Sequence, residues 1–333
     1  MTLPVFNVAG KPGNLDKQSY AVLTGKLEFS ADRLPGTKLF GAIKHATVTH
    51  AKIKSIDITA AMKEPGVKAI ITYKEAATVF NPTILYWGQP VAGIVADDWY
   101  AALRAVNQIN VTYDVLPAIV DPDEALKPGA VLSGKRADTN IAESSFTRGD
   151  INVGLQAAEV TLETTQPWTV TNQHNQVENH EAVAWWINDH VYVYQASQNP
   201  HGIKSGVVNY LQIPFDKCHC FARGTGGGHG DRSGQWEAGC AAFMSKAVNG
   251  APVFFKTTRK HHMLAWIRQH DHRSVYKLGA KKDGTLTALD AQHFANGTGA
   301  GMPTVWRVTY KIPNVRWAGK GIYINVPDRG AWR

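Results

Sequence analysis

The sequence predicts a mixed α/β protein of the α+β type with about two domains, and three observations lead to this prediction. Apolar, β-branched runs alternate with helical patterns over the first third of the chain. A stretch rich in Pro, Asp, Gly and Ser follows, and a second alternating series comes after it. The length of 333 residues suits two domains of about 100–200 residues each.

The first domain is predicted over residues 21–120, after an extended N-terminal arm at residues 1–20. Asp97 and Asp98 precede a predicted helix and can cap its N-terminus. Hydrophobic periodicity predicts these elements in chain order: strand 38–46, strand 51–58, short helix 59–63, strand 67–73, strand 90–96, helix 99–108 and strand 109–115.

Residues 121–155 are predicted as a linker, and residues 156–333 as a second domain. Asn188 and Asp189 are typical of a hairpin turn between two strands. The second domain is predicted to contain strands at 182–186, 191–195 and 217–222, helices at 202–211 and 234–248, and a later hairpin that turns at 282–284.

Charge and cysteine content exclude several classes of protein. The chain has 35 Lys and Arg residues against 27 Asp and Glu residues, which gives a net charge of +8. Such an excess attracts anions, but no nucleic-acid-binding motif is present. Cys218, Cys220 and Cys240 are too few for a disulfide framework or a four-cysteine iron–sulfur cluster. Without a secretory signal or an apolar run of about 18 residues, we expect a soluble, cytoplasmic protein that binds neither nucleic acid nor membrane.

A glycine-rich loop at residues 224–230 lies between a predicted strand and a predicted helix. Backbone N–H groups at such a place can bind an anion. The loop is neither a Walker loop nor a dinucleotide fingerprint, because His229 or Asp231 occupies the third glycine position. It is interpreted as a tight turn or as a segment that approaches a ligand closely, and its five glycines in seven residues favour the ligand.

Two other segments also have two interpretations. Residues 195–201 form either a helix cap, with Pro200 in the first turn, or part of a binding site. A histidine cluster matches no common zinc spacing and lies among basic side chains, so a solvated basic face is favoured over a metal site. Its members are His261, His262, His270 and His272.

Seven short segments carry a resemblance over nearly the whole chain. Those of the first domain are LTGKLEFSAD at 23–32, HAKI at 50–53, GQPVA at 88–92 and YDVLP at 113–117. Those of the second are ENHEA at 178–182, QNPH at 198–201 and GAWR at 330–333. In this order they resemble the molybdenum-binding subunit of the xanthine dehydrogenase/aldehyde oxidase family of molybdopterin hydroxylases. The resemblance implies an N-terminal α/β hammerhead domain followed by the first part of a molybdopterin-binding domain.

The resemblance also implies the cofactors. Molybdopterin, as the plain pterin or its cytosine dinucleotide form, would carry molybdenum or tungsten without a direct protein ligand. [2Fe–2S] clusters and FAD would lie on an iron–sulfur subunit and a flavin subunit. Gln198, Gly228, His229, Gly230 and Arg333 would bind the cofactor, because glycines permit close approach, Gln198 donates without charge and Arg333 is a charged fork.

Three positions depart from the family pattern. His229 stands where the family usually has phenylalanine, and either donates to substrate or cofactor or packs in its place. Ser233 replaces a glutamate of purine-oxidising relatives, and residues 296–302 lack their substrate-binding arginine, which argues against xanthine as the substrate. His229, Ser233 and Trp332 are the candidate substrate-pocket residues.

The sequence ends at Arg333, inside the family's motif and before its catalytic glutamate. The general base is therefore expected on a second molybdopterin-binding chain that completes the active site, or the chain is truncated. The implied reaction is hydroxylation or oxidation of a carbon in an N-heterocycle, aldehyde or aromatic small molecule, with water as oxygen source. Carbon monoxide oxidation, aromatic acyl-CoA reduction and a non-catalytic structural subunit remain alternatives.

Overall fold

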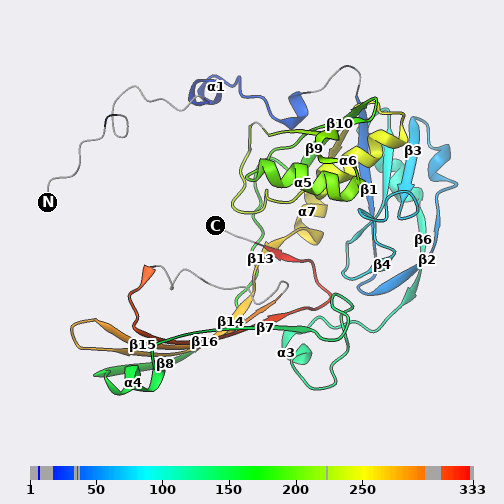
Figure 1. Cartoon of the computed structure of the whole chain (residues 1–333). Coiled ribbons are helices and arrows are strands. Elements are labelled where there is room, and N and C mark those ends of the chain that lie inside the picture. The colour runs from blue at the N-terminus through cyan, green and yellow to red at the C-terminus, as the bar shows by residue number, and fades with distance from the viewer. Residues whose placement is uncertain are drawn as a thin grey trace.

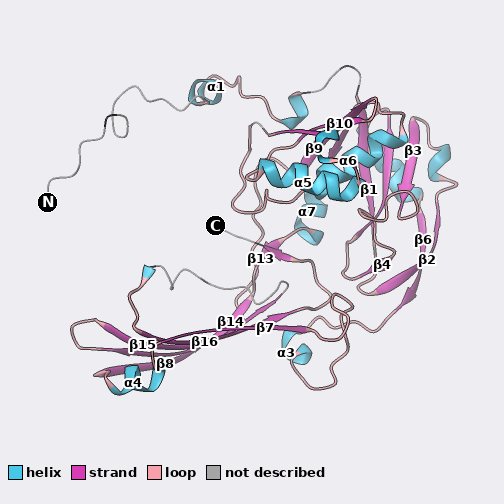
Figure 2. Ribbon diagram, in the orientation of Figure 1, coloured by secondary structure: helices cyan, strands magenta, loops and turns pink. Residues whose placement is uncertain are grey.

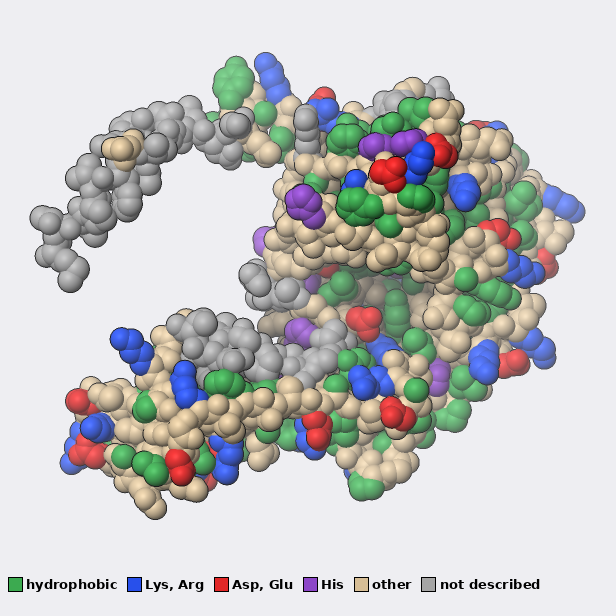
Figure 3. Space-filling model, in the orientation of Figure 1, with side chains coloured by type: hydrophobic (Ala, Val, Ile, Leu, Met, Phe, Trp, Pro, Cys, Tyr) green, Lys and Arg blue, Asp and Glu red, His purple; other side chains and the backbone are tan. Residues whose placement is uncertain are grey.

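The computed structural model describes residue 7 and residues 18–33, 36, 38–222, 224–296 and 309–330. These residues form two lobes (Figure 1). One lobe is a sheet covered by helices, and the other is an extended sheet with little helix (Figure 2). A recess separates the lobes on the face that Figure 3 shows, and histidine side chains lie around it.

The first lobe is built on a seven-stranded sheet that takes strands from both predicted domains. β1 and β12 are parallel neighbours, with Leu39 opposite Val253 and Gly41 opposite Phe255. Their backbone hydrogen bonds therefore join the two halves of the chain into one sheet. The strands, in spatial order, are β11 (Cys218–Phe221), β10 (His190–Tyr194), β9 (Glu181–Ile187), β12 (Val253–Lys256), β1 (Leu39–His45), β5 (Pro90–Ala96) and β3 (Val67–Thr72).

Helices cover both faces of this sheet. α2 (Trp99–Gln108) packs against β1 and β5, and Asp98 caps it by accepting from the N–H groups of Tyr100 and Ala101 at 2.8 and 2.9 Å. α5 (Pro200–Leu211) and α6 (Trp236–Ala247) cover the opposite face. Every residue of β5 is buried, as expected for a strand that is covered on both faces.

The second lobe is a five-stranded sheet whose strands are mainly antiparallel. Its apolar face buries Leu289, Val315 and Trp317. The strands, in spatial order, are β7 (Ile141–Arg148), β16 (Asn314–Ile322), β15 (Leu286–Asn296), β14 (His272–Ala280) and β8 (Val160–Gln166).

Smaller elements complete the described structure. A three-stranded sheet contains β4 (Thr83–Ile84), β2 (Ala51–Asp57) and β6 (Asn110–Val115), and a two-stranded sheet contains β13 (Arg268–Gln269) and β17 (Arg329–Gly330). The other helices are α1 (Ser19–Leu23), α3 (Pro122–Ala125), α4 (Ile151–Gln156), α7 (Arg259–Ala265) and the 3₁₀ turns Ser30–Asp32, Ala61–Lys63 and Phe215–Lys217. Within these ranges, no helix has the length and apolarity to cross a membrane.

The mixed α/β fold class and the main elements are confirmed. All strands and helices predicted at residues 38–115 and 182–248 are present, and the predicted short helix is a 3₁₀ turn at Ala61–Lys63. Most of the predicted N-terminal arm lies outside the described residues, and α1 occupies its end.

The expected linker at residues 121–155 is in part an ordered element of the second lobe. It contains α3, β7 and α4, and β7 pairs with β16 from Ile141 opposite Ile322 to Arg148 opposite Val315. The expectation of a plain linker is therefore wrong for this strand. β7 is an edge strand with exposed Glu143, Ser144 and Ser145, so it lacks the apolar run by which a buried strand is recognised.

Candidate functional site

The glycine-rich loop connects β11 to α6, and two of its glycines leave no place for a side chain. Gly227 has a φ of +96°, which L-residues rarely adopt. A Cβ on Gly228 would lie 2.5 Å from Cδ and Oε1 of Gln198. The N–H of Gly226 donates to Oε2 of Glu178 at 2.7 Å. The loop backbone is therefore held close to two polar side chains from other segments.

Gln198 is fixed against this loop with its carbonyl oxygen already used. Its Oε1 accepts from the N–H of Gly230 at 2.9 Å, and its own backbone N–H donates to the carbonyl of Arg232 at 2.8 Å. The side chain is exposed, and none of the residues that the structure describes accepts from its Nε2. Both Nε2–H groups are thus available to a ligand that covers the loop.

The next residue confirms the cap interpretation of the same segment. Oδ1 of Asn199 accepts from the N–H of Gly202 at 3.0 Å and caps α5, with Pro200 in the first turn. The cap is thus observed at Asn199, while Gln198 lies at the glycine-rich loop and its part in a binding site stays a prediction.

The other predicted site residues are only partly placed. His229 is exposed and has a φ of +54°, and Ser233 is exposed. His229 is thus not packed in an apolar site, as a simple replacement for phenylalanine would be. Trp332 and Arg333 lie outside the described residues.

A pocket of about 370 Å³ lies beside the start of α6, but it does not include the predicted substrate residues His229 and Ser233. Its walls come from the segments on either side of β4, from α5, α6 and α7, and from the residue before β17. Its main side chains are Tyr86, Gln89, Trp236, His261, Trp266 and Asp328.

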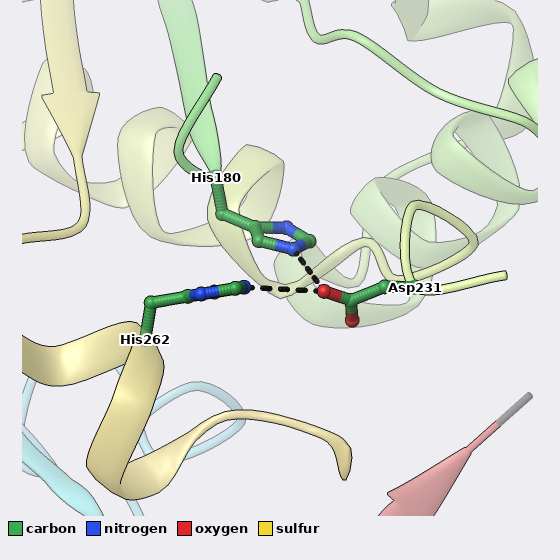
Figure 4. Close-up of side chains that lie close together, drawn as sticks. All are labelled: His180, Asp231 and His262. Atoms are coloured by element: carbon green, nitrogen blue, oxygen red, sulfur yellow. Dashed lines mark hydrogen bonds and ion pairs between the residues drawn. The ribbon is translucent and has the colours of Figure 1, made fainter. Parts of the chain in front are cut away.

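Directly beneath the loop, three buried side chains converge (Figure 4). His180 precedes β9, Asp231 follows the glycine-rich loop, and His262 belongs to α7. Oδ2 of Asp231 lies 2.8 Å from Nε2 of His180 and 3.2 Å from Nε2 of His262. Each residue is at most 1% exposed. These three residues are named here the His–Asp–His cluster.

Two further buried side chains contact the His–Asp–His cluster. Nδ1 of His180 is hydrogen-bonded to Oε1 of Glu237. Nε2 of Gln176 lies 3.0 Å from Oδ2 of Asp231 and 2.8 Å from Nε2 of His180. The cluster therefore has a second layer of polar contacts within the core.

Burial and the neighbouring carboxylates act in opposite directions on this cluster. Burial opposes the charged form of His180, but Glu237 and Asp231 outweigh it and raise the pKa of His180 to about 9. Burial disfavours ionised Asp231, yet the hydrogen bonds from His180 and His262 hold the pKa of Asp231 well below its usual range. Burial lowers the pKa of His262.

The prediction of a solvated basic face is wrong for His261 and His262, which are buried. The short helix α7 contacts the protein on two sides. Nδ1 of His261 lies 2.6 Å from Nε2 of His45 in β1, while His262 contacts Asp231. Because successive helical residues point about 100° apart, both histidines are buried only when two sides of a helix are covered.

Sequence reasoning did not find the His–Asp–His cluster. Asp231 is 31 residues from His262 and 51 residues from His180, so no local spacing links the three residues. One signal was present, because Asp231 occupies a glycine position of the loop pattern. A buried carboxylate after a glycine-rich loop needs partners, but the sequence does not identify them.

Comparison with known proteins agrees with this architecture. Residues 24–117 match the family described as "Aldehyde oxidase and xanthine dehydrogenase, a/b hammerhead domain" and residues 134–333 match "Molybdopterin cofactor-binding domain". The nicotinate dehydrogenase large molybdopterin subunit of Eubacterium barkeri is 26% identical, over 98% of this chain and 82% of the relative. The carbon monoxide dehydrogenase large chain of Hydrogenophaga pseudoflava is 27% identical, over 96% of this chain and 45% of the relative.

Solved structures show the same fold. Quinoline 2-oxidoreductase from Pseudomonas putida 86 superposes with a TM-score of 0.85 at 22% identity, over 96% of this chain and 45% of that one. Reconstituted CO dehydrogenase from Oligotropha carboxidovorans superposes with a TM-score of 0.82 at 25% identity, over 95% of this chain and 44% of that one. The chain spans less than half of the Hydrogenophaga relative and of both structures. It therefore belongs to the xanthine dehydrogenase and aldehyde oxidase family of molybdenum-binding large subunits, with a hammerhead domain followed by a molybdopterin cofactor-binding domain.

Proposed function

We propose that this chain forms one side of the cofactor site in a multi-subunit molybdenum hydroxylase. One observation carries the proposal: the glycine-rich loop of the matched cofactor-binding domain holds the amide of Gln198 through the N–H of Gly230. This contact leaves the Nε2–H donors without an acceptor among the residues that the structure describes. A neutral amide suits oxygen atoms of a metal–pterin cofactor, because it donates hydrogen bonds without adding charge.

The residues of the loop fit such a cofactor. Gly228 has no room for a Cβ beside Gln198, so glycine at this position lets the Gln198 amide lie directly against the loop backbone. In this proposal Gln198 donates through Nε2, Gly228 and Gly230 form the backbone wall, and Arg333 supplies a charged donor for anionic oxygens. The bound molybdopterin would supply a two-electron oxidation in which water provides the oxygen, while the protein binds and orients it. His229, which is exposed, is proposed to contact cofactor or substrate.

The substrate class that we propose is a carbon centre in an N-heterocycle, aldehyde or similar aromatic compound. The names of structural relatives support it, since they include quinoline 2-oxidoreductase and an aldehyde oxidoreductase from Desulfovibrio gigas. His229, Ser233 and Trp332 are the proposed substrate-side residues of this chain.

We further propose that a second molybdopterin-binding chain supplies the general base, and that iron–sulfur and flavin subunits remove the electrons. The match to 82% of a relative named as a large molybdopterin subunit supports this division. The complex is therefore expected to contain iron as well as molybdenum or tungsten.

The test is made on the complex that co-purifies with this chain from its native cells. Metal analysis and intact-mass identification of every subunit should show molybdenum or tungsten together with iron and a second large chain. Gln198→Ala should reduce turnover, whereas Gln156→Ala, an exposed glutamine in α4 of the other lobe, should not. A complex without either metal, or turnover unchanged by Gln198→Ala, would instead support a non-catalytic structural subunit.

A further inference from the structure

We propose that the His–Asp–His cluster of His180, Asp231 and His262 binds one structural zinc ion beneath the glycine-rich loop. These residues supply three of its ligands. This site is separate from the proposed molybdenum site, because Gln198 and Gly230, which would meet the pterin, are not among its ligands.

Three ligand atoms of the kind that zinc prefers converge in the cluster. Those of His180, Asp231 and His262 all lie within 4.8 Å of one another. Zinc bonds of ~2.0–2.1 Å place tetrahedral ligand atoms ~3.3 Å apart. The separations of 2.8 and 3.2 Å from Asp231 Oδ2 to the two histidine nitrogens differ from that value by about half an ångström or less.

The polar atoms of this cluster crowd one another when no metal is bound. Gln176 Nε2, His180 Nε2 and Asp231 Oδ2 are all within hydrogen-bond distance of one another, at 2.8, 3.0 and 2.8 Å. If the amide donates to both neighbours, the lone pair of His180 Nε2 faces the carboxylate oxygen. If His180 Nε2 carries a proton for Asp231, that N–H faces the amide N–H. A turned amide satisfies both contacts only if Asp231 is protonated and donates to the amide oxygen.

A cation removes this conflict. His180 Nε2 and Asp231 Oδ2 then both direct lone pairs to the metal, and Gln176 remains a donor to Asp231. Oδ1 of Asp231 is buried and has no partner among the residues that the structure describes, so this oxygen also gains from a nearby positive charge.

Two buried carboxylates lie against His180. Oδ2 of Asp231 contacts its Nε2 and Oε1 of Glu237 contacts its Nδ1. A metal ion bound at Nε2 would take the place of a proton there, while the Nδ1–H donates to Glu237. The adjacent Arg232 is engaged elsewhere, 3.1 Å from Glu178. A carboxylate behind a metal-binding histidine is a common second layer that fixes the ring.

The ligand types favour zinc and a structural role. Imidazole nitrogens with one carboxylate suit zinc better than the hard cations Mg²⁺ and Ca²⁺. The site is closed to solvent, since its three ligands are at most 1% exposed. It joins the segment before β9, the end of the glycine-rich loop and α7, so the ion would hold the base of the loop in place.

The experiment uses the full chain without an affinity tag, together with any subunits that co-purify. After dialysis against metal-free buffer, elemental analysis should find about one zinc per chain. Titration of the metal-free protein with Co²⁺ should give the visible absorption of a tetrahedral N/O site. Zinc is counted separately from molybdenum and iron, so failure here is distinguishable from failure of the proposed function.

Matched variants locate the ion. Asp231→Asn and His262→Gln should lower zinc content at least about tenfold, and Glu237→Gln should weaken zinc affinity about 10–100-fold. His261→Gln changes a buried histidine of the same helix that is not a ligand, and should keep the zinc. Wild-type protein that takes up neither zinc nor Co²⁺ would overturn the proposal. So would zinc retained by both ligand variants. If the variants do not fold, the Co²⁺ titration of the wild-type chain decides.

Discussion

The hydrogen bond between Gln198 Oε1 and the N–H of Gly230 sets which atoms of the loop can meet a ligand. It uses the acceptor of the amide and leaves its donors available. A Cβ on Gly228 would lie only 2.5 Å from the nearest side-chain atoms of Gln198. Gly228 permits this arrangement because it has no Cβ. Gly228 does not have a positive φ, so its requirement is for space and not for backbone conformation.

Gly228→Ala should therefore displace Gln198 and impair the cofactor site without unfolding the chain. We expect the molybdenum or tungsten content of the complex to fall about tenfold, with a melting temperature close to that of the wild type. Elemental analysis and thermal denaturation measure the two effects. Gly234→Ala is the control, because its Cβ would meet nothing closer than 3.9 Å. Equal metal content in both variants would contradict the role of this contact.

Among the elements, α6 packs on strands from both halves of the chain. Its Met244 is fully buried and fills the space over Gly41 of β1 and Gly93 of β5. A Cβ on these glycines would lie 2.5 Å from the sulfur and 2.7 Å from the terminal methyl of Met244. The helix and the sheet thus interlock through one side chain and two glycines.

Met244→Ala should leave a cavity at this contact and lower the free energy of unfolding by about 2–5 kcal/mol. Met62→Ala is the control, since Met62 is 43% exposed and its loss should change stability by no more than about 0.5 kcal/mol. Chemical denaturation followed by tryptophan fluorescence measures both. If Met244→Ala lowered the free energy of unfolding as little as Met62→Ala does, the core would have relaxed around the missing side chain.

The five-stranded sheet contains a buried histidine whose charge state should couple folding to pH. His293 in β15 is 8% exposed, and its Nδ1 lies 2.8 Å from Oγ of Ser274. Burial, followed by the nearby His272 and His270, lowers the pKa of His293 to about 4. The folded protein therefore keeps His293 neutral over a pH range in which the unfolded chain, with the ordinary pKa of 6.5, binds a proton.

Stability should consequently fall as the pH decreases from about 6.5 towards about 4. For His293 alone the loss is about 2 kcal/mol at pH 5. His293→Gln removes the titrating group, so the difference in unfolding free energy between pH 7 and pH 5 should be smaller in this variant by that amount. His201→Gln, at an exposed position in α5, should keep the wild-type difference. Denaturant titrations at the two pH values provide the comparison.

At the scale of the whole molecule, the hammerhead domain and the cofactor-binding domain share the seven-stranded sheet. β1 lies between β5 of its own domain and β12 of the other. The apolar cluster on one face joins Ile43, Ile71 and Val95 to side chains of β9, β12 and α6. A cut between the domains would expose both an unpaired strand edge and an apolar face.

A fragment of residues 18–120 should therefore not fold alone, whereas co-expression with residues 121–333 should restore solubility. Circular dichroism and the dispersion of amide resonances in ¹H–¹⁵N spectra test this directly, with the full chain as reference. A well-dispersed spectrum from the isolated fragment would show that the β1–β12 pairing is dispensable for the first domain.

The sequence by itself determined the local elements and the family. Hydrophobic periodicity, the Asp98 cap and the turn at Asn188 and Asp189 act over a few residues, so they are legible without the fold. The glycine-rich loop was also identified from its composition, because the chemistry of glycine is local, and Gln198 was predicted from the family resemblance.

Only the tertiary structure decided which distant segments meet. It placed β1 beside β12, made residues 141–148 an edge strand, and buried His261 and His262, which the sequence indicated as a solvated face. It also brought Asp231 to His180 and His262 across 51 and 31 residues. The physical reason is that strand pairing and core contacts depend on chain topology, and polar residues at an edge or in a buried cluster carry no periodic signal of their partners.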